Sequence, residues 1–360
     1  MKAIKRITAL ALCALMLLGL LSGCGEKKQG DEKFVLNASV CNVIDSLDPA
    51  MNTDTDADSV FYALYENLMR ESDDGSGEVT LTNGMAKEYA EETNYDGSVT
   101  YRFTLRSTAR WSDGEKVTAD DFVYAWQRLA DPATDSPNHA LMSVVAGYDE
   151  VRETGDKTKL QVSAKDESTF VVTLSAPCAY FIEGICTAVA TMPLRRDLTE
   201  NGGGFDTPDL VSNGELTAAR NDEYYEARLV GPDELNFIFT ANADEAWQLY
   251  EAGEIDYIAH LPNSVIAELS QDESWKPTAV YATASVLYNN ESDTFSNEHI
   301  RKAFDLAIDR AAATAACGAE NSPATGLVPY GIPDSGETED DFRTTGGELC
   351  AIDEEGMSAR

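Results

Sequence analysis

The sequence has few residues suited to nucleophilic or metal chemistry. Only three histidines occur among 360 residues, and they lie far apart, at His139, His260 and His299. The HExxH pattern of zinc proteases and the GxSxG pattern of serine hydrolases are both missing. With 63 acidic residues a chance pair of carboxylates is nearly certain, so no glycosidase pair can be singled out. We therefore expect a non-enzymatic protein without catalytic residues, metal or cofactor.

Positive charge is also scarce. Lys and Arg total 27 against 63 Asp and Glu, which gives a formal net charge of −36. A field of this sign repels phosphate backbones and anionic lipids, so nucleic acid is excluded as a partner, as is membrane attachment through surface charge. Hydrophobic residues make up 43% of the chain, which excludes wholesale disorder, and 360 residues suffice for two or three domains.

Long apolar runs are missing except at residues 7–21, which follow Lys2, Lys5 and Arg6 and precede Leu21-Ser22-Gly23-Cys24. The run is shorter than the roughly 20 residues of a membrane span. The arrangement resembles a bacterial lipoprotein signal, and an uncleaved anchor is the alternative. The resemblance implies a signal peptide at 1–23, lipidation of Cys24, and a solvated tether at 24–33. The protein would then be lipid-anchored in the cell envelope, on the outer face of the cytoplasmic membrane or in the periplasm.

The remaining cysteines indicate no metal or redox centre. Cys41, Cys178, Cys186, Cys317 and Cys350 form no CxxC pair of the kind found in zinc or thioredoxin-like sites. Cys178 and Cys186 are close enough in sequence to pair across a turn, but buried free thiols are the favoured interpretation.

Apolar periodicity predicts strands and helices without repeats, which favours a mixed α/β architecture. Strands are predicted at 34–40, 100–105 and 169–174, and a helix around Val60, Leu64 and Leu68 with Asp56 or Asp58 as its N-cap. Further helices are predicted from the capping box of Thr118 and Asp121 to Pro132, over 241–252 before Gly253, and over 300–317.

Several short motifs follow one another in order from residue 47 onward. They are Leu47-Asp48-Pro49, Trp111-Ser112-Asp113-Gly114, the segment 118–132, Ser136-Pro137, Val211-Ser212-Asn213-Gly214, Gly253-Glu254-Ile255-Asp256, and Ile300-Arg301-Lys302-Ala303 through Ile308-Asp309-Arg310. One such motif alone carries no weight. The ordered series resembles the extracellular solute-binding proteins of peptide ABC transporters, the oligopeptide-binding family (family 5), from Phe34 to the end of the chain.

That resemblance implies an α/β, two-lobed periplasmic-binding-protein-like fold with an extra inserted domain. Lobe I would comprise 34–65 and 195–282, the inserted domain II would comprise 66–194, and lobe III would begin at 283. The chain stops at Arg360, before the next helix of the family, so this lobe is expected to be truncated and ligand binding weak or absent. Only 215–219 separate Gly214 from Arg220, where the family has a further ladder, so we also expect an exposed sheet edge.

The resemblance also implies the ligand-binding residues. Thr53, Asp54 and Thr55 would offer backbone groups to a peptide, and Asn138 replaces a family tyrosine. Ile258 and His260 would line the cleft, with an anion or metal grip as the alternative role for His260. Tyr281 would lie on a hinge strand in which Val286 replaces a second tyrosine.

The leading hypothesis is therefore the substrate-binding lipoprotein of an ABC importer, which captures extracellular oligopeptides or dipeptides. Its partners would be the permease and ATPase subunits and, through lipid, the membrane, with a monomer expected. Two alternatives stay open: an exported lipid-anchored hydrolase, and a degenerate relative that does not transport.

Overall fold

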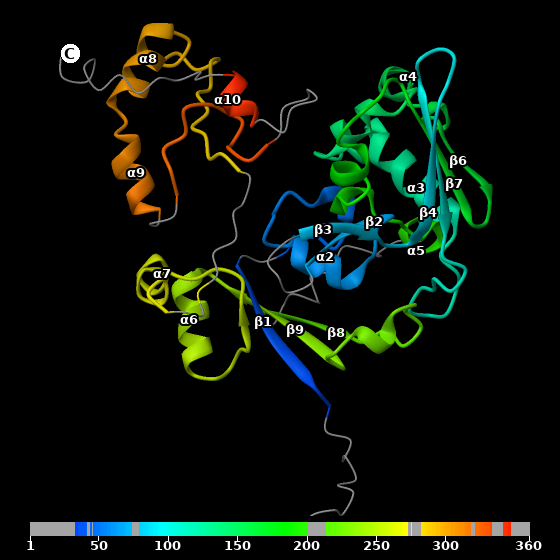
Figure 1. Cartoon of the computed structure of the whole chain (residues 1–360), viewed down its shortest axis with the longest axis horizontal. Helices are drawn as coiled ribbons and strands as arrows, with labels where there is room; N and C mark the ends of the chain where they lie inside the picture. Colours follow the sequence, from blue (N-terminus) through cyan, green and yellow to red (C-terminus); the bar gives the residue numbers. More distant parts are fainter. Residues whose placement is uncertain are drawn as a thin grey trace, which may run out of the picture.

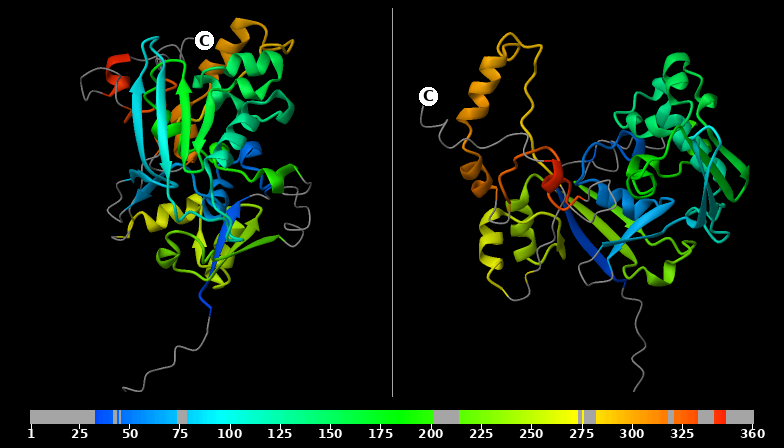
Figure 2. Two further views of the ribbon diagram at one scale, coloured as in Figure 1. Left: turned by 90° about the vertical axis from the view of Figure 1, so that its right-hand side faces the viewer. Right: turned by 45° about the horizontal axis from the view of Figure 1, so that its top comes forward.

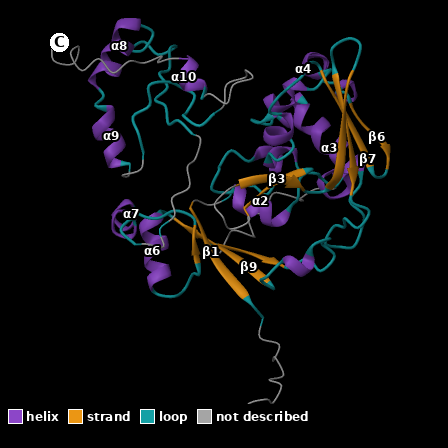
Figure 3. Ribbon diagram, in the orientation of Figure 1, coloured by secondary structure: helices purple, strands orange, loops and turns teal. Residues whose placement is uncertain are grey.

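The computed structural model describes residues 33–41, 44, 46–73, 79–200, 214–272, 275, 282–317, 321–332 and 341–346. The predicted signal peptide, Cys24 and most of the tether lie outside these residues, as does Tyr281. The described part of the chain contains two four-stranded sheets, one two-stranded sheet, helices that pack near them, and a separate group of C-terminal helices (Figures 1 and 3). None of the described helices combines the length and the apolar character that crossing a membrane would require.

The first sheet, called the mixed sheet, joins segments far apart in the sequence. Its strands are β1 (Val35–Cys41), β8 (Glu215–Ala219), β9 (Glu234–Thr240) and β10 (Tyr257–Ile258), in the order β10-β1-β9-β8. β1 runs parallel to both β9 and β10, whereas β8 is antiparallel to β9. The helix α6 (Ala243–Glu251) connects β9 to β10, and Gly253 follows it with a φ of 73°. β8 and β10 are the two edge strands of this sheet among the described residues.

A small hydrophobic core lies against the mixed sheet. The helix α2 (Asp58–Leu64) contributes Val60 and Phe61, both fully buried. The predicted helix is confirmed but ends earlier than expected, because the backbone turns extended at Tyr65 and leaves Leu68 outside it. The predicted N-cap is wrong, since Ala57 occupies that position. The other buried residues of this core are Ala38, Val40, Ile44, Ala57, Val189, Met192, Leu216 and Phe237.

The second sheet, called the antiparallel sheet, carries the larger core. Its strands are β4 (Ala86–Thr93), β5 (Val99–Leu105), β6 (Val162–Asp166) and β7 (Thr169–Leu174), in the order β4-β5-β7-β6. The helix α3 (Ala119–Ala130) packs against β6 and β7. β5, β7 and α3 confirm the predictions from periodicity, and the Asp121 carboxylate accepts from the Thr118 N–H at 2.8 Å, as a capping box requires. The largest fully buried side chains here include Phe103, Phe122, Trp126, Phe170 and Phe181.

The remaining elements connect or flank the sheets. β2 (Met69–Asp73) and β3 (Val79–Asn83) form an antiparallel pair between α2 and β4. The other short helices are α4 (Tyr148–Thr154), α5 (Arg196–Glu200) and α7 (Asn263–Leu269). Short 3-10 or π-helical segments occur at Pro49–Met51, Pro132–Thr134, His139–Val144, Lys157–Lys159, Phe181–Ile185, Val189–Thr191 and Ala227–Leu229.

The C-terminal helices α8 (Glu298–Ala307), α9 (Arg310–Ala316) and α10 (Phe342–Gly346) lie on the side of the molecule away from the antiparallel sheet (Figures 1 and 2). The prediction of one continuous helix over 300–317 is wrong. The chain breaks at Ile308 and Asp309, whose backbones are extended, and the Asp309 carboxylate then accepts from Ala312 N at 2.9 Å to cap α9.

The described cysteines with resolved side chains are free thiols. Cys178 is half-buried and Cys186 is buried, and burial raises the pKa of Cys186 well above its usual value. These two residues therefore do not form the disulfide that their spacing left open. Cys317 is exposed, contrary to the expectation of a buried thiol.

Candidate functional site

The first motif of the ordered series is held in place by an ion pair with α3. Arg128 donates to both carboxylate oxygens of Asp48, at 3.0 and 2.6 Å. Asp48 is only 4% exposed, and it also accepts from the Ala50 N–H at 3.0 Å. The bidentate geometry fixes the relative orientation of the Arg128 and Asp48 side chains as well as their separation. The turn that follows Asp48 is thus attached to the helix of the antiparallel-sheet unit.

Ser136 and Asn138, which follow Pro132 in the chain, hold the next stretch of this turn. The Ser136 hydroxyl donates to the carbonyl of Ala50 at 2.5 Å. The Asn138 side-chain amide donates to the carbonyls of Ala50 and Asn52, at 3.3 and 2.6 Å. The amide hydrogens of Asn138 therefore bond to protein carbonyls. These hydrogen bonds position the chain that leads into Thr53.

The loop 52–58, called the aspartate loop, keeps its shape through its own hydrogen bonds. The Asn52 side chain donates to Asp58 at 2.6 Å, and the Asp54 carboxylate accepts from the Asp56 N–H at 2.9 Å. Among the described residues, the N–H and C=O of Thr53 and the N–H of Thr55 have no hydrogen-bond partner, and both residues are exposed. These groups can therefore bond an extended chain laid across the loop.

The mixed sheet brings the second predicted segment to the same loop. Ile258 lies on β10, opposite Ser39 of β1, and is half-buried. Two residues later, His260 Nε2 lies 2.6 Å from the Asp56 carboxylate of the aspartate loop. The structure thus brings Asn138 and His260, which are widely separated in the sequence, to the loop that contains Thr53, Asp54 and Thr55.

The aspartate loop concentrates negative charge. Burial raises the pKa of Asp58, with a smaller opposing effect from the hydrogen bond of Asn52 and a further increase from Asp54. Among the described residues, neither Asp54 nor Asp58 forms an ion pair with lysine or arginine. The loop is therefore better suited to a ligand that carries positive charge than to an anion.

For the last two predicted residues, Tyr281 and Val286, the structure describes only the backbone and exposure of Val286. Tyr281 lies outside the described residues. The prediction that Val286 lies on a hinge strand is wrong, because 282–290 contain no strand and Val286 is 68% exposed.

Residues that sequence reasoning missed provide the supports of this site. Asp56 bonds His260, and Ser136 and Arg128 anchor the turn. Ser136 and Arg128 belong to motifs of the ordered series. Their partners, Asp48 for Arg128 and Ala50 for Ser136, could not be predicted because contacts between distant segments produce no local pattern in the sequence. Within the described ranges, no group of three or more His, Cys, Asp or Glu side chains is placed to hold a metal.

A cavity of about 840 Å³ lies elsewhere, bounded by residues of α2, β2, β8 and β9 and by the turn at Trp111. None of the predicted binding residues that the structure describes lines it.

The chain was compared with known families and structures. The family of bacterial extracellular solute-binding proteins, family 5 Middle, matches residues 80–348. The oligopeptide-binding protein OppA of Bacillus subtilis (strain 168) is 29% identical over 355 residues, which are 90% of this chain and 63% of that protein. The dipeptide-binding protein DppE of the same organism is 26% identical over 382 residues, 98% of this chain and 68% of that protein.

A solved structure has the same fold. Burkholderia pseudomallei OppA gives a TM-score of 0.73 at 26% identity, over 84% of this chain and 61% of that one. The chain therefore spans about two thirds of the length of the proteins it matches. The predicted periplasmic-binding-protein-like α/β fold is confirmed.

Proposed function

The chain belongs to family 5 of the bacterial extracellular solute-binding proteins, and on that basis we propose that it captures peptides outside the cytoplasmic membrane for an ABC importer. Its relatives include proteins named for binding oligopeptides and dipeptides. The partners proposed here are the permease and ATPase subunits. A non-enzymatic monomer attached by lipid at Cys24 completes the proposal, with lobe I at 34–65 and 195–282, domain II at 66–194, and lobe III from 283.

The observation that carries this proposal is the convergence on the aspartate loop. The loop offers the N–H and C=O of Thr53 and the N–H of Thr55, while Asn138 and His260 hold it from two different parts of the fold. Backbone groups are common to all peptides, so a ligand held through them can vary in its side chains. Negative charge on Asp54 would favour the amino-terminal end of a peptide or a basic side chain.

Titration calorimetry on the protein isolated from its own cells tests the proposal, with trialanine and pentaalanine as probes. Asn138→Ala removes two hydrogen bonds to the loop and is expected to weaken peptide binding about tenfold. Asn94→Ala is the matched control, since its amide also makes two hydrogen bonds, to Ser98 and Thr100, in a distant turn. Its peptide affinity should match that of the unmodified protein.

Mass spectrometry of the recovered probes distinguishes this function from that of a hydrolase. A receptor returns both peptides intact. Cleaved trialanine, or identical peptide affinities for Asn138→Ala and the unmodified protein, would refute the proposal as stated.

A further inference from the structure

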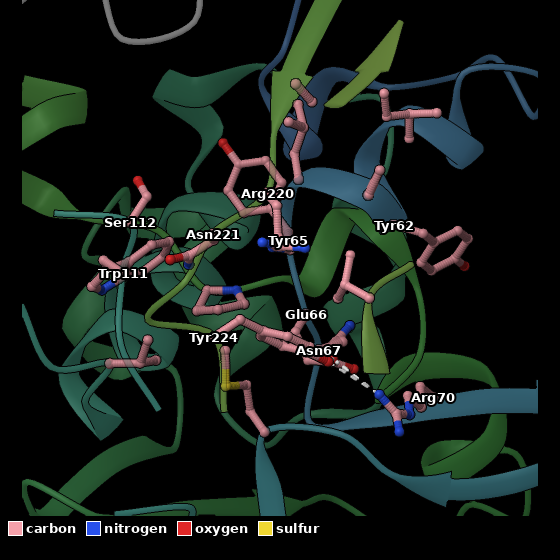
Figure 4. Close-up of a pocket in the computed structure, with 18 of the residues that line it drawn as sticks. Tyr62, Tyr65, Glu66, Asn67, Arg70, Trp111, Ser112, Arg220, Asn221 and Tyr224 are labelled. Carbon is pink, nitrogen blue, oxygen red and sulfur yellow. Dashed lines mark hydrogen bonds and ion pairs between the residues drawn. The ribbon is translucent and has the colours of Figure 1, made fainter. Parts of the chain in front are cut away.

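The cavity of about 840 Å³ shares no residue with the aspartate loop or its supports, so what it binds is a separate question from peptide capture. Its volume falls within the range of small-molecule sites, roughly 300–1,000 Å³. The lining mixes aromatic rings with charged and polar groups, among them Tyr65, Trp111, Arg70 and Tyr224 (Figure 4).

One group of lining residues is fully engaged within the protein. The Glu66 carboxylate accepts from the hydroxyls of Tyr224 and Tyr225 and from Arg70. Arg70 also donates to Glu226 at 2.8 Å (the Glu66–Arg70 region is shown in Figure 4). Burial and the hydrogen bond to Glu66 raise the pKa of Tyr224, which keeps this hydroxyl protonated. These groups shape the cavity, and the single positive charge of Arg70 is already paired with the carboxylates of Glu66 and Glu226.

A second group of lining residues has hydrogen-bond capacity left over. Arg110 donates through one nitrogen to the carbonyls of Ser107 and Ala109, and it forms no ion pair with any described carboxylate. Within the part of the chain that the structure describes, the hydroxyls of Tyr65 and Ser112 have no hydrogen-bond partner, nor does the side-chain amide nitrogen of Asn221. Every one of these groups can donate a hydrogen bond.

The guanidinium group determines the class of ligand. Arginine presents a planar set of N–H donors whose geometry matches a carboxylate. The N–H groups of Arg110 that make no bond within the protein can donate two parallel hydrogen bonds to one carboxylate. The adjacent Trp111 ring supplies an apolar face for the body of a ligand, while Tyr65, Ser112 and Asn221 can donate to further oxygens. A chain of net charge −36 repels anions in general, so only a local cation of this kind could retain one.

We propose that this cavity binds a small organic carboxylate with an aromatic or aliphatic body, its carboxylate at Arg110 and its body against Trp111. The site is separate from the proposed peptide site and would be occupied independently of it.

Titration calorimetry with benzoate, and with benzamide as its neutral counterpart, tests the proposal on the full chain. Benzoate should bind at least about tenfold more tightly than benzamide, and Arg110→Gln should remove that preference. Arg102→Gln is the matched control, because Arg102 pairs with Glu92 on the antiparallel sheet, away from the cavity, and it should keep the preference. Asn138→Ala should also leave benzoate binding unchanged, even if it weakens peptide binding.

The comparison of benzoate with benzamide requires no variant, so it decides the matter even if Arg110→Gln does not fold. Equal affinities for the two probes, or no benzoate binding at millimolar concentrations, would overturn the proposal. Loss of benzoate binding in Asn138→Ala would place the anion at the peptide site and would overturn it as well.

Discussion

Replacing Arg128 with methionine should destabilise the protein far more than the loss of an ordinary surface charge. The substitution keeps an unbranched apolar side chain on α3 but removes both hydrogen bonds to the buried Asp48. Breaking a buried pair from one side costs about 3–5 kcal/mol, since the other charge stays buried without a partner. Asp48 retains the N–H of Ala50, and the Arg128 side chain is 20% exposed, so we expect a loss near the lower limit, about 3 kcal/mol.

A double-mutant cycle separates the ion pair from general damage. Asp48→Asn removes the buried charge, so Arg128→Met should cost about 2 kcal/mol less in that background. Arg102→Met serves as the control, because Arg102 and Glu92 are largely exposed and their pair should contribute at most about 1 kcal/mol.

Urea denaturation followed by circular dichroism measures each free energy of unfolding, with an unchanged m-value as the sign that the same cooperative unit unfolds. A loss below about 1 kcal/mol for Arg128→Met, or strict additivity in the double variant, would refute the reasoning about a buried, coupled pair. Weaker peptide binding should accompany the loss, since Asp48 precedes the turn that leads into the aspartate loop.

Three further predictions concern backbone, core and pH. Gly147→Ala should lower the free energy of unfolding, measured by thermal denaturation, by more than about 2 kcal/mol, because φ is 85° and a Cβ would lie 2.1 Å from the Lys159 carbonyl oxygen. Gly155→Ala, with a φ of 71° and open space around the new Cβ, should lower it by about 1 kcal/mol. Equal losses would contradict this. Trp126→Ala should cost about 3–5 kcal/mol, since the side chain is fully buried and its Nε1 donates to the Thr191 carbonyl; a loss under 2 kcal/mol, on the order of a partly exposed residue, would not fit. Asp58→Asn should raise the melting temperature at pH 7, because the raised pKa of Asp58 means that its ionised form is disfavoured in the folded state. The gain in melting temperature should shrink as the pH falls through the raised pKa towards the usual value of 3.8. A gain that persists at about pH 3 would contradict the electrostatic cause.

The outcome for individual residues shows why some features could be predicted and others could not. The capping box of Thr118 and Asp121 depends on residues three apart, and the burial of Phe103 follows from alternation within one strand, so both were predictable. The break at Asp309 was missed because the apolar pattern continues across it, while the capping hydrogen bond that stops the helix competes with that pattern. Asp56 was one of two residues predicted to cap α2, but its carboxylate bonds His260 instead, and that partner is 204 positions away.

The amino-acid sequence alone determined the fold class and the family, because local periodicity and the order of short motifs are properties of the linear chain. The tertiary structure alone decided which of those segments meet. It attached Asp48 to Arg128, gave Asn138 a positioning role, left Val286 outside any strand and enclosed the cavity at Arg110. Such contacts depend on how sheets and helices pack in three dimensions, and residues that pack together need share no pattern in the sequence.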